Sequence, residues 1–234
     1  MLTGGHNCSE RLRRESRLIK TQMSVVALGF VFVLVLFCVA ATCLKAQVEA
    51  EAARRLGARE LNYLVALARE PLDALTESRT VRQPRDNAAM PFLNQSHPLA
   101  VTVWLDGSIL ARSVEIRQPM PLARGAMILG ARVLDSPDAG RVPTAEEWPK
   151  VKIAVAVMQK LAEVADDSEI AAGQAVVVVN GFKIAVGFPG DLPKNASVYD
   201  LLGKTCELFG LRSSSWLSER SSLLSAVVDE MLEK

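Results

Sequence analysis

Two stretches in the middle of the chain carry strand-like sequence, rich in β-branched and aliphatic residues, and each is interrupted by a turn dipeptide. The dipeptides are Asp106-Gly107 and Asn180-Gly181, which favour the two-residue turns of β-hairpins. The hairpin strands are predicted at residues 101–105, 109–116, 175–179 and 182–186. A further strand is predicted over residues 151–161, where apolar and other side chains alternate at the start.

Apolar residues at every third or fourth position predict helices in other segments. These helices are expected at residues 61–75, 121–134, 197–209 and 218–234. Pro71 falls inside the first of them and predicts a kink or a break there. Hairpins separated by helices, without a regular β-α alternation, predict an α+β fold with a mostly antiparallel sheet and flanking helices.

The segment Ser24–Leu44 differs from the rest because it is apolar and holds no charged residue. An apolar helix of about 20 residues spans a bilayer. A buried core helix and a cleaved signal peptide are the alternatives, but an apolar signal region has only about 7–15 residues. The pattern therefore favours one transmembrane helix, and five basic residues before it against four after it favour a soluble domain outside the cytoplasm.

These patterns divide the chain into five parts. They are a basic tail (1–22), a transmembrane helix (23–44), a helical stalk (45–58), an α+β domain (59–217) and a C-terminal amphipathic helix (218–234).

Composition excludes several classes of function. Lys+Arg 27 against Asp+Glu 26 leaves a net charge of +1, which gives no support for nucleic acid as a partner. The predicted domain holds a single cysteine, Cys206, and a single histidine, His97, so neither a disulfide within it nor a zinc site is expected. No phosphate-binding glycine motif occurs, and no cofactor is expected.

Arg112 is the one charged candidate on a predicted strand. It is interpreted either as an edge-strand arginine that discourages aggregation or as an anion contact in a cleft. The first interpretation is favoured because one arginine alone is weak support for a ligand site.

The order of the segments resembles the AMMECR domain family, the protein A component of the AmmeMemoRadiSam system, over residues 59–216. The similar stretches are LVALAREPLDAL, VTVWLDGSILARSVEI, DAGRVPTAEEWPKVKIAVAVM, GQAVVVVNGFKIAVGFP and LLGKTCELFGLRSSSW. The resemblance implies a central antiparallel sheet in a two-lobed α+β fold. It implies no settled biochemical activity.

The chain departs from the family at its most specific motif, Leu-Arg-Gly-Cys-Ile-Gly after the Asp-Gly turn. This chain has Ile109-Leu110-Ala111-Arg112-Ser113-Val114 there, so Arg112 stands in the cysteine's place and no catalytic residue carries over. The second strand is therefore expected to close a sheet rather than to carry chemistry. Any ligand-binding cleft is expected to involve Arg112, Ser113, Arg141, Phe188 and Pro189.

Three functions follow as hypotheses. The favoured one is a membrane-anchored, non-catalytic binding or scaffolding module with a protein partner at the membrane. The alternative is an enzyme that keeps the family's uncharacterised activity with substituted site residues. A small-ligand sensor is the third, and the identity of the ligand is open in each case.

Overall fold

One antiparallel sheet of six strands organises the protein. The computed structural model describes residues 55–82, 90–135, 141–193 and 195–233. The strands lie in the order β2-β1-β3-β6-β4-β5, and every neighbouring pair is antiparallel. They are β1 (Ser96–Leu105), β2 (Ser108–Pro121), β3 (Lys152–Val164), β4 (Ala175–Asn180), β5 (Lys183–Gly187) and β6 (Ser221–Leu232).

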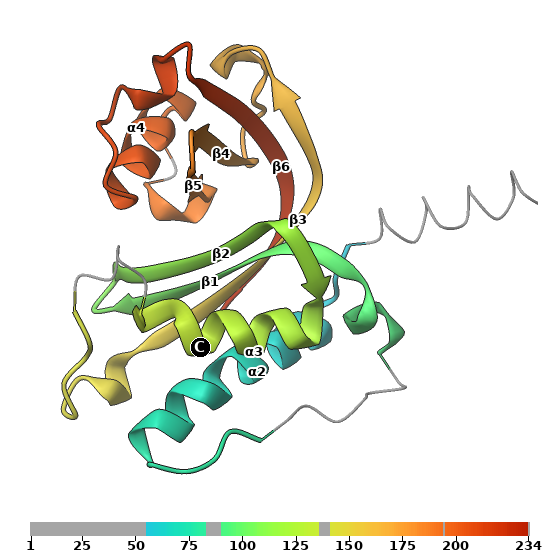
Figure 1. Ribbon diagram of the computed structural model, residues 1–234, viewed down its shortest axis with the longest axis vertical. Coiled ribbons are helices and arrows are strands. Elements are labelled where there is room, and N and C mark those ends of the chain that lie inside the picture. The colour runs from blue at the N-terminus through green and yellow to red at the C-terminus, as the bar shows by residue number, and fades with distance from the viewer. Residues whose placement is uncertain (1–54, 83–89, 136–140, 194, 234) are drawn as a thin grey trace, which may run out of the picture. The chain divides into compact units, whose positions relative to one another are not determined.

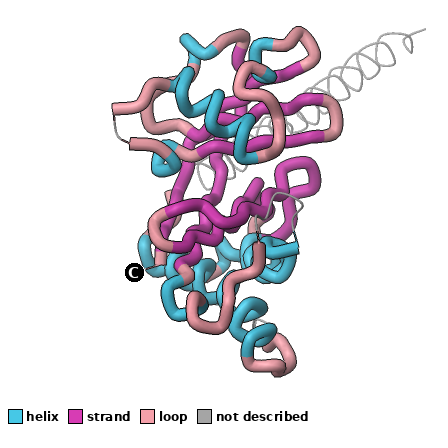
Figure 2. Tube along the Cα trace, turned by 90° about the vertical axis from the view of Figure 1, so that its left-hand side faces the viewer, coloured by secondary structure: helices cyan, strands magenta, loops and turns pink. Residues whose placement is uncertain are grey.

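Helices cover the sheet at its two ends (Figure 1). The α2 helix (Ala58–Thr76) and the α3 helix (Leu122–Arg132) pack on β1 and β3 around one apolar core, and α4 (Val198–Leu208) packs on β4 and β5 around a second. Figure 2 shows the strands between these helical layers. Short 3-10 helices occupy the connections: η1 (Pro91–Asn94), η2 (Val133–Asp135), η3 (Trp148–Lys150), η4 (Asp167–Glu169), η5 (Pro189–Asp191) and η6 (Ser215–Leu217).

The sheet curls until its two edge strands approach each other. Ala100 of β1, Val177 of β4 and the buried Phe188 belong to a third apolar cluster on the inner face. Arg112 and Arg117 of β2 then reach across to carbonyl oxygens of the β4–β5 hairpin, at distances of 2.7 and 3.2 Å. The result is a nearly closed barrel, in which arginine side chains bridge a gap that strand pairing leaves open.

Both predicted hairpins are confirmed, but the turn of the second is displaced by one residue from the predicted Asn180-Gly181. Asp106 and Gly107 have φ of 49° and 79°, the positive values that a type I′ turn requires. In the second hairpin Asn180 pairs with Lys183, so the two turn residues are Gly181, with φ of 59°, and Phe182. The predicted α+β class with a mostly antiparallel sheet is likewise confirmed. The first helix does not break at Pro71 but continues through it to Thr76.

The prediction of a C-terminal helix over 218–234 is wrong, because these residues form β6 in the centre of the sheet. The apolar doublets that suggested a helical stripe serve the two faces of a strand. Leu223 packs in the α4 core, whereas Leu224 packs against the inner-face cluster. A strand covered on both faces has no simple alternation and resembles a short helix in sequence.

The boundaries predicted for the domain also change. β6 brings residues 221–232 into the sheet, so the domain does not end at 217. It also begins before 59, because Leu56 is buried and its N–H donates to Oδ2 of Asp229 at 2.9 Å. Most of the predicted stalk, 45–58, and all of the basic tail, 1–22, lie outside the described residues.

The prediction of a membrane-anchored fold is corrected. Among the helices of the described ranges, none has the length and apolar content needed to cross a membrane. The segment predicted to do so, 23–44, lies outside the described residues. This finding contradicts three related predictions. They are the transmembrane element of the fold, the membrane as a partner, and a single-pass location with the domain outside the cytoplasm.

The contact between α2 and α3 depends on a glycine. A Cβ added to Gly130 of α3 would lie 2.2 Å from the backbone oxygen of Ala68 in α2. We expect Gly130→Ala to destabilise the protein by about 1–3 kcal/mol, because the overpacking outweighs the roughly 1 kcal/mol that alanine gains in helix propensity. Urea unfolding measures the change.

Gly203 of α4 provides the matched control. A Cβ there would meet its nearest neighbours at 3.8 Å, an ordinary contact. Gly203→Ala should leave stability unchanged or raise it by up to about 1 kcal/mol. Equal effects of the two substitutions would contradict close packing of α2 on α3.

Candidate functional site

Arg112 forms a buried ion pair that joins β2 to the segment after β5. Its guanidinium donates to both carboxylate oxygens of Asp191, at 2.7 and 2.6 Å, and the two side chains are 3% and 1% exposed. The same group donates to Oγ1 of Thr102 at 2.8 Å and to the carbonyl oxygen of Val186 at 2.7 Å. All three guanidinium nitrogens therefore donate to acceptors within the protein. Arg112 joins the edges of the sheet, and its guanidinium is not available to bind an anionic ligand.

The other side of this ion pair holds the η5 turn in place. Asp191 accepts from the N–H of Phe188 at 2.8 Å, and its own N–H donates to the Phe188 carbonyl oxygen at 2.9 Å. The ring of Phe188 lies under the guanidinium, 4.6 Å from its centroid to Cζ of Arg112, which adds a cation–π contact. The four residues from Phe188 to Asp191 are thus held from both ends.

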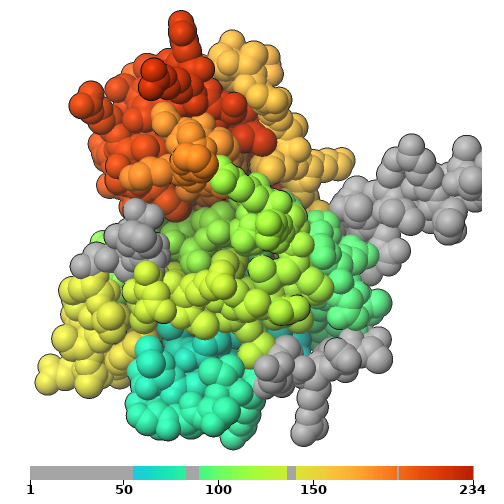
Figure 3. All heavy atoms as spheres, viewed as in Figure 1, coloured from blue at the N-terminus to red at the C-terminus, as the bar shows by residue number. Residues whose placement is uncertain are grey.

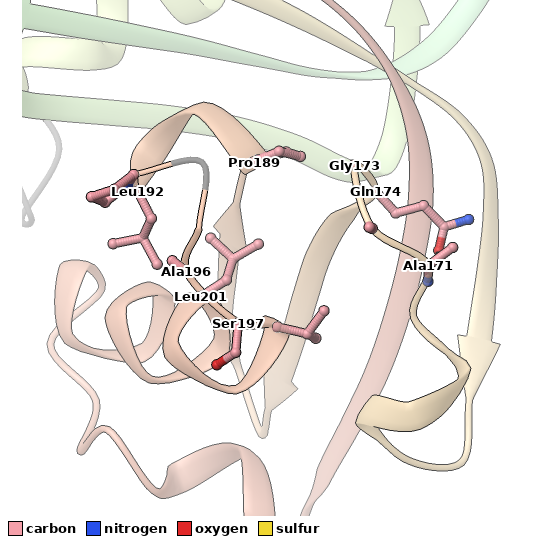
Figure 4. A pocket seen from close by; sticks show the side chains of 11 residues that line it. Ala171, Gly173, Gln174, Pro189, Leu192, Ala196, Ser197 and Leu201 are labelled. Atoms are coloured by element: carbon pink, nitrogen blue, oxygen red, sulfur yellow. The ribbon is translucent and has the colours of Figure 1, made fainter.

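The outer side of the same turn lines a pocket of about 360 Å³ (Figure 4). Pro189 and Leu192 form one wall, the first turn of α4 a second, and the turn before β4 a third. The lining residues are Ala171, Ala172, Gly173, Gln174, Pro189, Leu192, Pro193, Ala196, Ser197, Val198 and Leu201. None carries a charge, and the exposed residues among them place the mouth of the pocket at the surface.

Hydrogen bonds also hold the other two walls. Ser197 caps α4: its Oγ accepts from the N–H of Asp200 at 3.1 Å, while the Asp200 carboxylate accepts from the Ser197 hydroxyl and N–H. These bonds from Ser197 lower the pKa of Asp200. In the turn before β4, Oε1 of Gln174 accepts from the N–H of Ala171 at 2.9 Å. The pocket is therefore formed by walls whose backbone is already fixed.

The structure brings together only part of the predicted site. Arg112, Phe188 and Pro189 meet at η5. Ser113 follows Arg112 on β2 and faces the other side of the sheet, since neighbouring strand residues point to opposite faces. Arg141 pairs with Glu147 through two bonds of 2.5 and 2.6 Å, and this pairing lowers the pKa of Glu147 to about 2.

Two further groups bear on the chemistry of the domain. Cys206 is fully buried among the apolar residues of α4, and burial raises the pKa of its thiol, which disfavours the nucleophilic thiolate. Glu230 of β6 lies beside η5, where a Cβ on Gly190 would stand 3.7 Å from its Oε2. Loss of hydration, and then the charge of Asp191, raise the pKa of Glu230, although Arg112 acts in the opposite direction.

Sequence reasoning missed Asp191 and the two walls of the pocket beyond Pro189. One signal for Asp191 was present: an acid three residues after Phe188, on the far side of Pro-Gly, is placed to bond back to the turn. No local signal indicated that residues 171–174 and 196–201 would meet, because their approach depends on the pairing of β4 with β5 and β6.

Comparisons with known proteins identify the fold but no family. No family model matches the chain, and no curated protein matches it. The structure is similar to the crystal structure of an uncharacterized protein from Pyrococcus horikoshii, with a TM-score of 0.58 and 19% sequence identity. The match covers 74% of this chain and 90% of that one. At this identity the similarity concerns the fold alone.

The ion pair at the sheet closure predicts a large effect of truncation. Arg112→Ala should destabilise the protein by about 3–5 kcal/mol, because it leaves the Asp191 carboxylate buried without its partner. The double change Arg112→Met with Asp191→Asn should cost clearly less than Arg112→Ala. Urea unfolding of the variants provides the measurement.

Arg141→Ala is the matched control, since it breaks an arginine–carboxylate pair at an exposed position. It should change stability little. A small effect of Arg112→Ala, similar to that of Arg141→Ala, would show that the closure does not depend on the ion pair.

Substitution of Glu230 is expected to stabilise the protein, in contrast to substitution of Arg112, and by an amount that depends on pH. Its raised pKa means that the folded state disfavours the ionised carboxylate, so the contribution of Glu230 to stability is lost as the pH rises through its folded pKa. Because the Glu230 side chain is exposed and solvent screens its charge, Glu230→Gln should raise the thermal midpoint at pH 7 only slightly, and the gain over wild type should shrink as the pH falls through that pKa. A midpoint difference that stays constant with pH would contradict this assignment.

Proposed function

We propose that the described part of the chain is a non-catalytic binding module, and that its ligand-binding site is the pocket between η5, α4 and the turn before β4. The observation that carries the proposal is the uncharged pocket of about 360 Å³ with its walls fixed by hydrogen bonds. Ligand pockets have volumes of about 300–1,000 Å³ and mostly apolar walls.

The lining determines the class of ligand that fits. Aliphatic side chains, prolines and small residues make up most of the surface, with Gln174 and Ser197 as the polar members. A charged group placed there would lose hydration without an ion partner, which is unfavourable. The ligand is therefore a small, uncharged molecule, or an uncharged apolar side chain of a larger one.

The absence of catalysis in this proposal rests on the family that the chain resembles. We propose an AMMECR-like domain in which the signature cysteine is replaced by Arg112, and every nitrogen of the Arg112 guanidinium is occupied within the protein. In this proposal, the position of the family's cysteine holds an arginine that closes the sheet. The likeness of the fold to the Pyrococcus horikoshii protein is compatible with this proposal.

A pocket-filling substitution tests the binding site. Cyclohexanol is a suitable probe because it is small, uncharged and mostly apolar. Its titration, followed by amide chemical shifts, should perturb residues 171–174 and 196–201 in the wild-type protein. Ala196→Trp should abolish these shifts, because the indole occupies the space that Ala196 leaves open.

Two controls accompany this titration. Ala145→Trp places the same side chain at an exposed position outside the pocket, and the shifts should be unchanged. Cyclohexanecarboxylate has the same ring with a negative charge and should bind more weakly. Shifts that are absent in the wild type, or that survive Ala196→Trp, would refute the assignment of this pocket.

A further inference from the structure

A second pocket, of about 460 Å³, lies where the end of β3 meets the start of β6. Val164 pairs with Leu223 at this point, so the two strands are in direct contact. Figure 3 shows the corresponding segments side by side at the top of the molecule, orange-yellow beside red. The η4 turn and the η6 turn complete the walls. This pocket shares no residue with the one between η5 and α4.

The walls of this pocket carry one sign of charge. Four carboxylates line it, from Glu163, Asp166, Asp167 and Glu219, and no lysine, arginine or histidine does. Hydrogen bonds from Ser168 lower the pKa of Asp166, which keeps that group ionised. Arg220 is the nearest basic residue along the chain, but it does not line the pocket. The chain as a whole carries a charge of only +1, so this concentration of acids is local.

The margin of the pocket also carries an apolar side chain, that of Leu217, which no part of the described chain covers. Leu217 is 59% exposed at its margin, next to the buried Trp216. Tyr199 of α4 meets the Trp216 ring edge-on, with 5.1 Å between centroids, and it too is exposed. An exposed leucine beside a fixed aromatic pair is suited to bury an aliphatic side chain of a partner.

We propose that this acidic pocket is a docking surface for a basic peptide segment of a partner protein, one that carries lysine or arginine beside an aliphatic residue. The partner's cations would face Glu163, Asp167 and Glu219, and its aliphatic side chain would cover Leu217. Charge complementarity commits the site to this occupant, because an acidic or uncharged segment would leave the carboxylates unpaired.

A binding experiment on the full chain tests the proposal. The probe is a short fluorescein-labelled peptide that alternates lysine and leucine, followed by fluorescence anisotropy. It should bind about tenfold more tightly than peptides that alternate glutamate and leucine or lysine and serine, and its affinity should fall as salt is added. Equal binding of the three peptides would overturn the proposal.

Substitutions then place the binding on the surface. Leu217→Ser, and separately the double change Glu163→Gln with Asp167→Asn, should each weaken binding about tenfold. Leu75→Ser removes an equally exposed leucine from α2, and Glu146→Gln removes an exposed carboxylate from the loop before β3. Neither should change the affinity, and losses as large as those at the pocket would show that the peptide binds elsewhere.

Two further results separate this inference from its alternatives. Ala196→Trp fills the pocket between η5 and α4 and should leave peptide binding unchanged. The small-ligand proposal and the peptide-docking proposal can therefore fail independently of each other. Sedimentation should show that Leu217→Ser does not alter the oligomeric state. If it converts a dimer to a monomer, a second copy of the chain covers the pocket and the basic partner is excluded.

Discussion

The structure depends on the burial of one arginine and one carboxylate between the edges of a curled sheet. Removing two charges from water costs several kcal/mol per ion unless geometry and hydrogen bonding compensate. Arg112 and Asp191 meet this condition, because the guanidinium has four acceptor contacts and a ring beneath it, while the carboxylate has a backbone donor in addition. The unpaired edge of a sheet can pair with a strand of another molecule. Here the edges β2 and β5 face each other, and arginine side chains of β2 contact the β4–β5 hairpin.

That closure also positions the surface around it. The η5 turn is held by Asp191 on the inner side and presents Pro189 and Leu192 on the outer side. An ion pair that is buried in the closure of the sheet thereby determines where this pocket forms, although neither of its residues lines the pocket. Glu230 lies beside η5 without a place in this network: loss of hydration, and then the charge of Asp191, raise its pKa, although Arg112 acts in the opposite direction.

The features that could be predicted from the sequence are those set by local chemistry. Asp106-Gly107 and the cap residue Ser197 act on their immediate neighbours, and both produced the expected turn or helix start. Features that depend on distant partners were missed or misjudged. The apolar doublets of β6 fit a helix equally well until β3 and β4 are known to flank them, and nothing near Arg112 in sequence indicates that Asp191 would neutralise it.

The place of β6 in the sheet has a consequence for the order of folding. The hairpins β1–β2 and β4–β5 close over turns of two residues and can form early, because short loops cost little entropy. β6 comes last of the six along the chain, yet it lies between β3 and β4 and is the strand that pairs with both of them. Backbone pairing between the two hairpins is therefore completed only through β6. Because this pairing joins segments far apart in the sequence, we expect it to form after the hairpins, together with the Arg112–Asp191 contact that bridges β2 and the segment after β5.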